Sequence, residues 1–274
     1  EREREIAITT PDILLCNCYS MLLPASLLAI PKLCVNCHAG WVPFFRGANP
    51  RQWALIHNSQ KHGVTLHKMS SALDEGDTLC VKTFPISITD TWKDLQKQDQ
   101  KIAETLWETY LPKILTGENL SFTPQNAQQA KTWPHRKPED GRLTREMSIQ
   151  LIYNTVRALV APLPGAFWED ERSVERWDQF LPLQKIAFRV SQWRRWETAN
   201  GRILIPEETQ SFDTLSFHLL SSNGSNIPVT IEIEGNMRLL KIRTSKNLLT
   251  PSMQELLLRF CSDEFPLSQT SWIA

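Results

Sequence analysis

The stretch Leu33-Cys-Val-Asn-Cys-His-Ala-Gly-Trp-Val-Pro-Phe-Phe-Arg-Gly47 carries the features that decide the fold. Its apolar start predicts a buried strand that ends near His38. Side chains alternate across a strand, so Asn36 and His38 point to the same side. Asp74 follows a helix-like run and a second predicted strand, at the mouth of another turn. An amide, an imidazole and a carboxylate at the ends of neighbouring strands would suit acyl transfer.

The residues on either side of this stretch predict alternating strands and helices. Upstream, Ile13-Leu-Leu-Cys16 predicts a strand and Pro24-Ala-Ser-Leu-Leu-Ala-Ile30 a short helix. Strand, helix and strand make a βαβ unit, whose two strands should be parallel. Downstream, the pattern predicts a helix opened by Asn49-Pro50, strands at 64–69 and 78–81, and a long amphipathic helix from Thr91 to Gly117. The first half is therefore predicted to be α/β, with a parallel sheet.

The second half differs in pattern. Its composition first turns to Gln, Asn, Lys and Pro, which predicts a linker. An amphipathic helix carrying Ile149 to Leu159 follows, and then come short strands with turn signals between them. The expected strands are 186–190, 203–205, 215–220, 229–233 and 239–242. We therefore predict a catalytic domain at 1–124, a linker at 125–140, a smaller β-rich, barrel-like domain at 141–245, and a C-terminal helix and tail at 246–274.

Composition restricts the class of protein. The 274 residues suffice for one large or two ordinary domains. Lys+Arg and Asp+Glu are both 30, so the basic excess typical of nucleic-acid-binding proteins is missing, although a local basic patch stays open. No run approaches the roughly 18 apolar residues of a membrane span. With no signal peptide and no paired cysteine spacing, we expect a cytoplasmic protein with no membrane partner.

The cysteines offer two alternative interpretations. Cys34-Val-Asn-Cys37-His38 spells the motif of covalent haem attachment, and Cys16 and Cys18 could complete a four-thiolate zinc site with the other two. Positions 34 and 37 of a strand face opposite sides of the sheet, which disfavours a shared ion. Because free cysteine packs as a small hydrophobe, we expect free, reduced and metal-free thiols.

The remaining histidines have plainer interpretations. His67 lies on an alternating strand and is expected to pack beside the site or to support it from behind. His57, His62 and His135 are expected at the surface.

Several motifs, in order, resemble the folate-dependent formyltransferase family. They are Asn36-x-His38, Pro43-x-x-Arg46-Gly47, Gly63-Val-Thr-x-His67 and Leu73-Asp74-x-Gly76-Asp77. The second-half motifs are similar to amino-sugar members rather than to methionyl-tRNA formyltransferase. They are Arg136-x-Pro138-Glu-Asp-Gly141, Tyr153-Asn-x-x-Arg157-Ala and Pro162-x-Pro-Gly-Ala-Phe167. The resemblance covers about residues 11–168, and it implies a Rossmann-like sheet followed by a β-rich domain.

The resemblance also implies the chemistry. In this family an amine attacks the formyl group of 10-formyltetrahydrofolate, and negative charge builds on the formyl oxygen. Asn36 and a protonated His38 would donate hydrogen bonds to that oxygen; one such donor contributes about 2.7–4 kcal/mol in acyl-transfer enzymes. Asp74 would favour the charged imidazole and, directly or through water, move the proton from the amine. No metal is implied.

The binding residues follow from the resemblance alone. The pterin would be held around Tyr19, Met21 and Leu22 and by the loop of Asp74. The candidate folate-binding residues on that loop are Leu73 and Glu75. The candidate substrate-binding residues are Arg46 and Gly47, and Arg46 could anchor a phosphate or simply form a turn.

Two departures from the family stand out. Gly40-Trp41-Val42 occupies the place of the family's Ser-Leu-Leu. Only ten residues precede Pro11 to Cys16, the segment that holds the first predicted strand, whereas the family opens with further βα units. We expect a fragment, or else a chain that has lost part of its Rossmann-like half, and in either case little activity from these residues alone.

The acceptor amine stays open. A nucleotide-linked amino sugar is the first expectation, and methionyl-tRNA is the alternative. A third interpretation is an inactive formyltransferase-like domain within a larger peptide-synthetase-type assembly, because Ser216 to Phe260 is faintly similar to the end of a condensation domain. The acceptor could then be an amine on a carrier protein.

Overall fold

The computed structural model describes most of the first 169 residues and separate parts of the rest. The described ranges are 8–19, 21–144, 146–169, 174–177, 197–198, 201–204, 214–221, 226–234, 239–244, 249–264 and 269–273. The chain divides into two compact units, one within residues 1–54, 61–86 and 92–137, the other within 55–60, 87–91 and 138–274.

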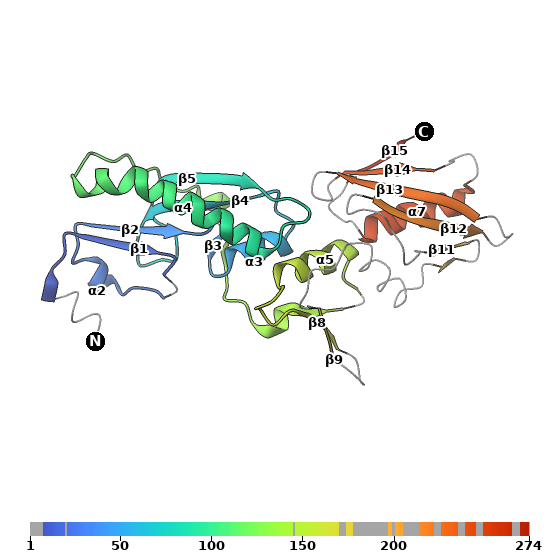
Figure 1. The fold of residues 1–274 in the computed structure, drawn as a ribbon, viewed down its shortest axis with the longest axis horizontal. Coiled ribbons are helices and arrows are strands. Elements are labelled where there is room, and N and C mark those ends of the chain that lie inside the picture. Colours follow the sequence, from blue (N-terminus) through green and yellow to red (C-terminus); the bar gives the residue numbers. More distant parts are fainter. Residues whose placement is uncertain are drawn as a thin grey trace. The chain divides into compact units, whose positions relative to one another are not determined.

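The first unit is an α/β structure around a four-stranded sheet with the order β1-β2-β4-β5 (Figure 1). Its elements are β1 (Ile13–Asn17), α2 (Ala25–Leu28), β2 (Leu33–His38), β3 (Arg46–Gly47), α3 (Pro50–Ile56), β4 (Lys61–Lys68), β5 (Thr78–Pro85), α4 (Trp92–Leu115), the 3-10 turn η1 (Ala127–Gln129) and β6 (Thr132–Trp133). The predicted βαβ unit and the predicted long helix are both present. The short strand β6 lies within the stretch predicted as a linker, and it pairs in parallel with β3.

The direction of the strands differs in part from the prediction. β1 and β2 are parallel, with Ile13 opposite Leu33, as the βαβ unit requires. β4 is antiparallel to β2, and β5 is antiparallel to β4. The loop 69–77 between β4 and β5 is too short for the crossover that a parallel pair needs. The sheet is therefore mixed, and this loop returns Asp74 to the end of β2.

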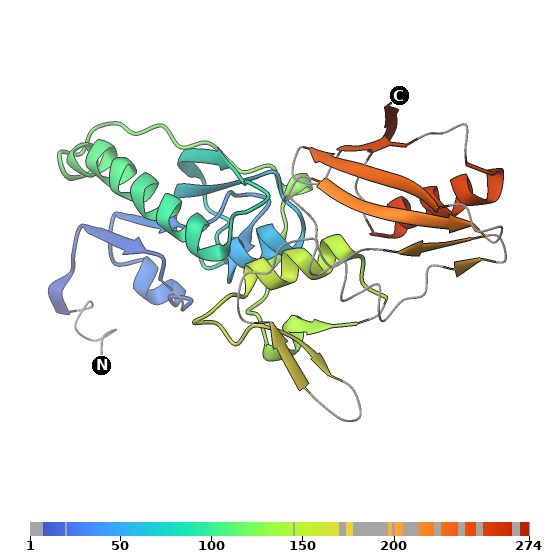
Figure 2. The ribbon, with the colours of Figure 1, turned by 45° about the vertical axis from the view of Figure 1, so that its right-hand side comes forward.

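The core of the first unit lies between the sheet and α4, which runs along one face of the strands (Figure 2). Val35 and Cys37 of β2 and Val64 and Leu66 of β4 point to this face because they alternate with polar residues. Buried residues of α4, including Leu106, cover them. The opposite face of the same strands is left to Asn36 and His38.

Leu66→Ala is expected to lower the free energy of unfolding by about 2–5 kcal/mol. Leu66 is fully buried, so the substitution creates a cavity under α4. Leu115→Ala at the exposed end of α4 is the matched control, with an expected change within about 0.5 kcal/mol. Urea unfolding monitored by circular dichroism measures both. Equal losses would show that the core lies elsewhere.

The second unit is β-rich in its described part. It contains a three-stranded sheet, β7-β8-β9, and a six-stranded sheet with the order β10-β11-β12-β13-β14-β15. The elements are η2 (Pro138–Gly141), β7 (Arg142–Leu143), α5 (Ile149–Ala158), β8 (Ala166–Glu169), β9 (Val174–Trp177), β10 (Glu197–Thr198), β11 (Gly201–Leu204), β12 (Thr214–Ser221), β13 (Asn226–Glu234), β14 (Leu239–Arg243), α7 (Pro251–Glu264) and β15 (Gln269–Ile273).

Half of the described second-half elements were predicted, including the C-terminal helix α7, whereas β7 to β10 and β15 were not. Helix α5 and strands β11 to β14 coincide with the expected segments, while the strand expected at 186–190 lies outside the described residues. Among the described strands, β10 and β15 do not pair, so the six-stranded sheet is open rather than a closed barrel. The α/β first half and the β-rich second half are confirmed as fold classes.

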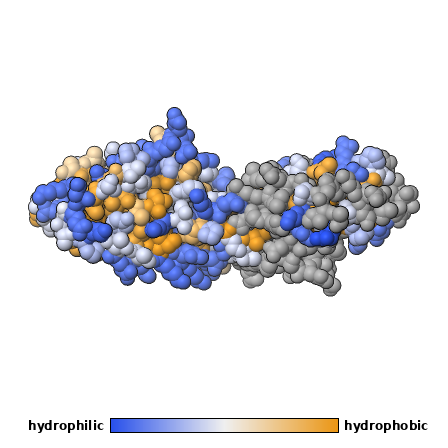
Figure 3. All heavy atoms as spheres, turned by 90° about the horizontal axis from the view of Figure 1, so that it is seen from above, coloured by the Kyte–Doolittle hydropathy of each residue, from blue (hydrophilic) through white to orange (hydrophobic). Residues whose placement is uncertain are grey.

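Some large apolar side chains stay at the surface of the first unit, where Figure 3 shows hydrophobic residues gathered on the face in view. The most exposed are Ile8, Met21 and Leu22, with Leu115 at the end of α4. In the part of the chain that the structure describes, the helices are too short or too polar to span a membrane.

Candidate functional site

His38 ends β2, and both of its ring nitrogens have neighbours. Nε2 lies 2.8 Å from the Phe45 carbonyl oxygen, and Nδ1 lies 3.5 Å from Oδ2 of Asp74. A carbonyl oxygen only accepts hydrogen bonds, so Nε2 carries the hydrogen. Nδ1 is then the basic atom of the neutral ring. A proton that arrives at Nδ1 would be stabilised by the adjacent carboxylate.

Gly40 makes this ring position possible. A Cβ added at residue 40 would overlap the His38 ring and the Phe45 carbonyl oxygen. The departure from the family's serine at this position therefore has a physical consequence: the His38 ring lies where a side chain at residue 40 would otherwise be.

Asp74 lies at the tip of the loop between β4 and β5 in a left-handed backbone conformation, with φ of 53°. Asp tolerates this conformation better than most residues. The backbone N–H of Gly47 donates to its Oδ2 at 2.8 Å. Gly47 has φ of 89°, and an added Cβ there would overlap the Trp133 carbonyl oxygen. Two unusual backbone positions thus hold the carboxylate against His38.

Asn36 and His67 complete the polar cluster that contains His38 and Asp74. They lie opposite each other in the β2–β4 pairing, with Asn36 Nδ2 3.4 Å from His67 Nε2. The same His67 nitrogen lies 3.4 Å from Oδ1 of Asp74, and His67 Nδ1 donates to the Lys68 carbonyl oxygen at 2.7 Å. Asn36 Oδ1 is buried and has no hydrogen-bond partner among the described residues. His67 therefore links the predicted amide to the predicted carboxylate.

His67 does not line the cleft, and its position agrees with the expected role beside or behind the site. What the sequence did not show is that His67 contacts both Asp74 and Asn36. The signal was available, because an antiparallel partner directly opposite Asn36 must lie on the same face of the sheet. The direction of β4 was what the prediction lacked.

A cleft of about 250 Å³ opens beside this cluster. His38, Asp74 and Gly47 line it, together with Tyr19 and Leu73. Asn36 is buried, does not line the cleft and contacts His67. The structure therefore brings His38 and Asp74 together at a cleft and places Asn36 behind them.

Burial decides the charge of the His38–Asp74 pair. It lowers the pKa of His38 below its ordinary 6.5, although the Asp74 charge and the Phe45 carbonyl oxygen act the other way. Burial alone would raise the pKa of Asp74, but the hydrogen bond from His67, the His38 charge and the Gly47 N–H together lower it. The free protein pairs a neutral imidazole with an ionised carboxylate at neutral pH. Asp74 does favour a charged imidazole, as expected, but burial outweighs that contribution.

The lowered pKa of His38 predicts how stability depends on pH. The unfolded chain takes up a proton on His38 near pH 6.5, while the folded chain resists protonation to a lower pH. The His38 contribution is fully present above pH 6.5 and is lost as the pH falls through the folded pKa. Urea unfolding between about pH 7.5 and 5 should therefore show decreasing stability, and His38→Asn should flatten the decrease. An unchanged slope in that variant would contradict the assignment.

The candidate folate-binding residues divide into two groups. Tyr19 and Leu73 line the cleft and keep about 40% of their surface exposed. Met21 and Leu22 are more exposed and are not part of its lining, although they belong to the same loop after β1. Glu75 lies 3.2 Å from Arg46 in an ion pair. An open apolar rim around Tyr19 and Leu73 is the part of this set that can contact a flat ring.

The candidate substrate-binding residues are engaged within the protein. Arg46 is buried; its Nε donates to Oε1 of Gln125 at 3.0 Å, and its Nη1 contacts Glu75. Gln125 in turn donates to the carbonyl oxygens of Asp74 and Gly76. Arg46 therefore braces the loop of Asp74, and Gly47 supplies its backbone N–H to the carboxylate.

The cysteines are present as six free thiols. Cys34 and Cys37 are both buried, and burial raises the pKa of Cys37 to about 12, which disfavours the thiolate that a metal needs. In the described residues no three His, Cys, Asp or Glu side chains gather as a metal site would require.

His62 corrects a further expectation. It was expected at the surface, like His57 and His135, but its side chain is fully buried next to Asp99. His57 and His135 are exposed, as expected.

Comparisons with known proteins point to one chemistry. A family model described as formyl transferase matches residues 1–110. A curated methionyl-tRNA formyltransferase from Citrifermentans bemidjiense is 32% identical over 244 residues, which cover 87% of this chain and 70% of the relative.

Solved structures share the fold at lower identity. A sugar N-formyltransferase from Shewanella sp. FDAARGOS_354 has a TM-score of 0.56 at 19% identity, over 64% of this chain and 73% of that one. An N-formyltransferase from Helicobacter canadensis, solved with folinic acid and dTDP-3-aminofucose, has a TM-score of 0.50 at 16% identity, over 77% of this chain and 70% of that one. At these identities the likeness concerns the fold alone.

Proposed function

This chain belongs to the formyl transferase family, and we propose that it transfers the formyl group of 10-formyltetrahydrofolate to a primary amine on a nucleotide-linked amino sugar. The observation that carries the proposal is the His38–Asp74 pair at the cleft, with 3.5 Å between Nδ1 and Oδ2. A neutral imidazole beside an ionised carboxylate is ready to accept one proton.

In the proposed mechanism, His38 and Asp74 handle the proton of the attacking amine. As the amine nitrogen bonds to the formyl carbon, one of its protons passes to Nδ1 of His38. Asp74 stabilises the resulting imidazolium, and the proton then goes to N10 of the folate as the carbon–nitrogen bond breaks. The pair is regenerated, and the products are tetrahydrofolate and the formylated amine.

The charge on the formyl oxygen requires a donor, and Asn36 is the proposed one. Its Oδ1 is buried without a partner among the described residues, and its Nδ2 faces His67. An amide that turns by 180° exchanges its donor and its acceptor. Such a turn would aim Nδ2 away from His67, so that Asn36 could donate to the oxygen from beneath the cleft. A preorganised donor of this kind contributes about 2.7–4 kcal/mol.

The apolar residues at the cleft fit the flat pterin ring of the formyl donor. Tyr19 and Leu73 line the cleft with partly exposed apolar surface, and the buried His38 lines it as well. The Helicobacter canadensis structure was solved with folinic acid, a formylated folate, which supports a folate ligand for this fold. Donor binding through Tyr19, Met21, Leu22, Leu73 and Glu75 remains part of the proposal.

Two candidate acceptors have support. The nucleotide sugar is supported by the amino-sugar motifs in the second half and by the dTDP-3-aminofucose in the Helicobacter canadensis structure. Methionyl-tRNA is supported by the curated relative at 32% identity. Equal numbers of basic and acidic residues weigh against tRNA, because phosphate neutralisation drives RNA affinity.

An acceptor competition assay distinguishes the two. The protein in its full natural chain length is given 10-formyltetrahydrofolate with dTDP-3-aminofucose, or with methionyl-tRNA, at equal concentrations. We expect kcat/KM for the sugar nucleotide to exceed that for methionyl-tRNA by at least about 100-fold, the ratio that a few missing hydrogen bonds produce. A preference for methionyl-tRNA would replace the proposed acceptor and leave the formyl transfer itself intact.

A further inference from the structure

A second buried charged cluster lies near the cleft, and the proposed mechanism does not use it. Arg51 of α3 donates from Nε to Oδ2 of Asp99 in α4 at 2.5 Å. His62 of β4 places Nε2 3.3 Å from the same oxygen. His62 and Asp99 are almost fully buried, whereas the Arg51 side chain is 20% exposed. The buried Asp99 and His62 therefore hold the partly exposed guanidinium of Arg51.

In this cluster the guanidinium of Arg51 donates through Nε. Arginine carries five N–H donors in a rigid planar fork. Within the described residues, the Nε contact with Asp99 is its hydrogen bond, and its two terminal amino groups have no partner. An arginine whose task is only to neutralise Asp99 would gain more from a contact through two nitrogens. The outer edge of Arg51 is thus a fixed pair of free donors.

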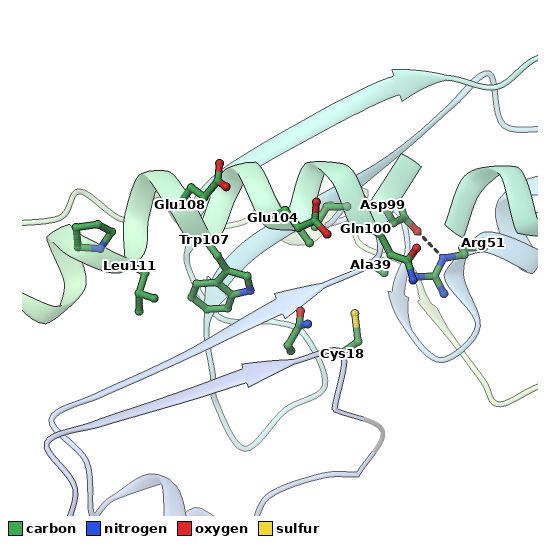
Figure 4. A pocket seen from close by; sticks show the side chains of 13 residues that line it. Cys18, Ala39, Arg51, Asp99, Gln100, Glu104, Trp107, Glu108 and Leu111 are labelled. Carbon is green, nitrogen blue, oxygen red and sulfur yellow. Dashed lines mark hydrogen bonds and ion pairs between the residues drawn. The ribbon is translucent and has the colours of Figure 1, made fainter. Parts of the chain in front are cut away.

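This edge lies where two cavities meet. The cleft that contains His38 and Asp74 shares Cys18, Ala39 and Arg51 with a larger cavity of about 500 Å³. The larger cavity continues along α4, where Figure 4 shows Arg51 and Asp99 at one end and Trp107 and Leu111 farther along the helix. A group bound by Arg51 can therefore belong to a ligand that also reaches His38.

The geometry of the Arg51 guanidinium indicates which chemical group of a ligand it would bind. Two parallel N–H donors match the two oxygens of a carboxylate or a phosphate. Asp99 offsets the charge of Arg51, but it also fixes the direction of the fork, so geometry rather than net charge favours binding. Glu104 and Glu108 line the larger cavity beyond Arg51 and repel anions there. The anionic group is therefore placed at the junction of the two cavities.

We propose that Arg51, held by Asp99 with His62 behind it, anchors an anionic oxygen group of the ligand whose reacting end lies beside His38. The inference rests on the proposed function and deepens it. Two sources carry such a group: the glutamyl carboxylates of the formyl donor and the phosphates of a nucleotide-linked acceptor.

Binding measurements with Arg51→Gln in the full natural chain separate the two sources. One arm compares folinic acid with 5-formyltetrahydropteroate, which lacks the glutamate. The other compares dTDP-3-aminofucose with free 3-aminofucose. Loss of a charged hydrogen bond should weaken the binding of either folinic acid or the sugar nucleotide by about 10- to 100-fold. The analogue that lacks the glutamate or the phosphates should bind the variant as tightly as it binds the unmodified protein.

Three controls keep the result interpretable. Arg142→Gln removes an arginine that pairs with Glu169 in the second unit, and it should change no dissociation constant. Arg51→Met combined with Asp99→Leu avoids leaving a buried unpaired carboxylate, and it should show the same loss as Arg51→Gln. Asp99→Asn removes the carboxylate that orients the Arg51 guanidinium, and it should weaken binding of the same ligand by a smaller factor.

All four ligands binding to the Arg51 variants within twofold of the unmodified protein would overturn the proposal and leave Arg51 a structural residue. The formyl transfer itself is tested separately through His38, which these variants leave in place. Turnover that depends on His38, with ligand affinities that do not depend on Arg51, would thus reject the inference and keep the proposed function.

Discussion

His38→Ala should lower kcat for formyl transfer by about 10²- to 10⁴-fold, the range typical of a general acid–base residue. His38 lines the cleft and holds a basic nitrogen next to the ionised carboxylate of Asp74. The ring also contacts Phe45, so its loss removes both the proton acceptor and a support of the loop after β2. Steady-state kinetics at saturating donor and acceptor measure the change.

His218→Ala is the matched control for this variant. His218 is exposed on β12 in the second unit, and its replacement should leave kcat within twofold. Folding of both variants is compared by circular dichroism. An active, folded His38→Ala protein would remove the proposed route of the proton.

Asp74→Asn should lower kcat by at least about 100-fold and should also change the pH profile. The carboxylate stabilises an imidazolium at His38, so without it the pKa of His38 falls further. The acid limb of kcat/KM should therefore move to lower pH even though the plateau drops. The substitution also replaces one of the two carboxylate oxygens, which contact Gly47 and His67, with an NH2 group.

The direction of the shift distinguishes this explanation from a merely structural one. A variant that only loosened the loop would lower the plateau and leave the limb in place. Asp94→Asn in the first turn of α4 is the control, because this carboxylate lies about half exposed and away from the cleft. A shift of the acid limb to higher pH would contradict the proposed interaction.

The sequence predicted much of the first unit because its patterns are local. The apolar run that ends in Asn36 and His38 alternates correctly, and Gly117 stops α4 close to the expected place. The parallel pair β1 and β2 was predicted correctly, but the directions of β4 and β5 were not, because a buried strand has a similar hydrophobic pattern in either direction. The short loop before β5 decides the direction of β5 relative to β4, and that loop also explains why Asp74 returns to His38.

The candidate site was predictable where one strand or one motif carries it. Asn36 and His38 share a face by the period of two, and the loop of Asp74 came from the family resemblance. The contacts of His67 needed the register between β2 and β4. His62, Asp99 and Arg51 come from three different elements, and nothing local in the sequence shows that they meet.

The most direct test of the central claim is transfer of an isotope-labelled formyl group from 10-formyltetrahydrofolate to dTDP-3-aminofucose by the full natural chain. We expect tetrahydrofolate and the labelled formamide in equal amounts, with almost no product from His38→Ala or Asp74→Asn. No transfer to any amine, or equal transfer by the folded variants, would contradict the assignment of this site.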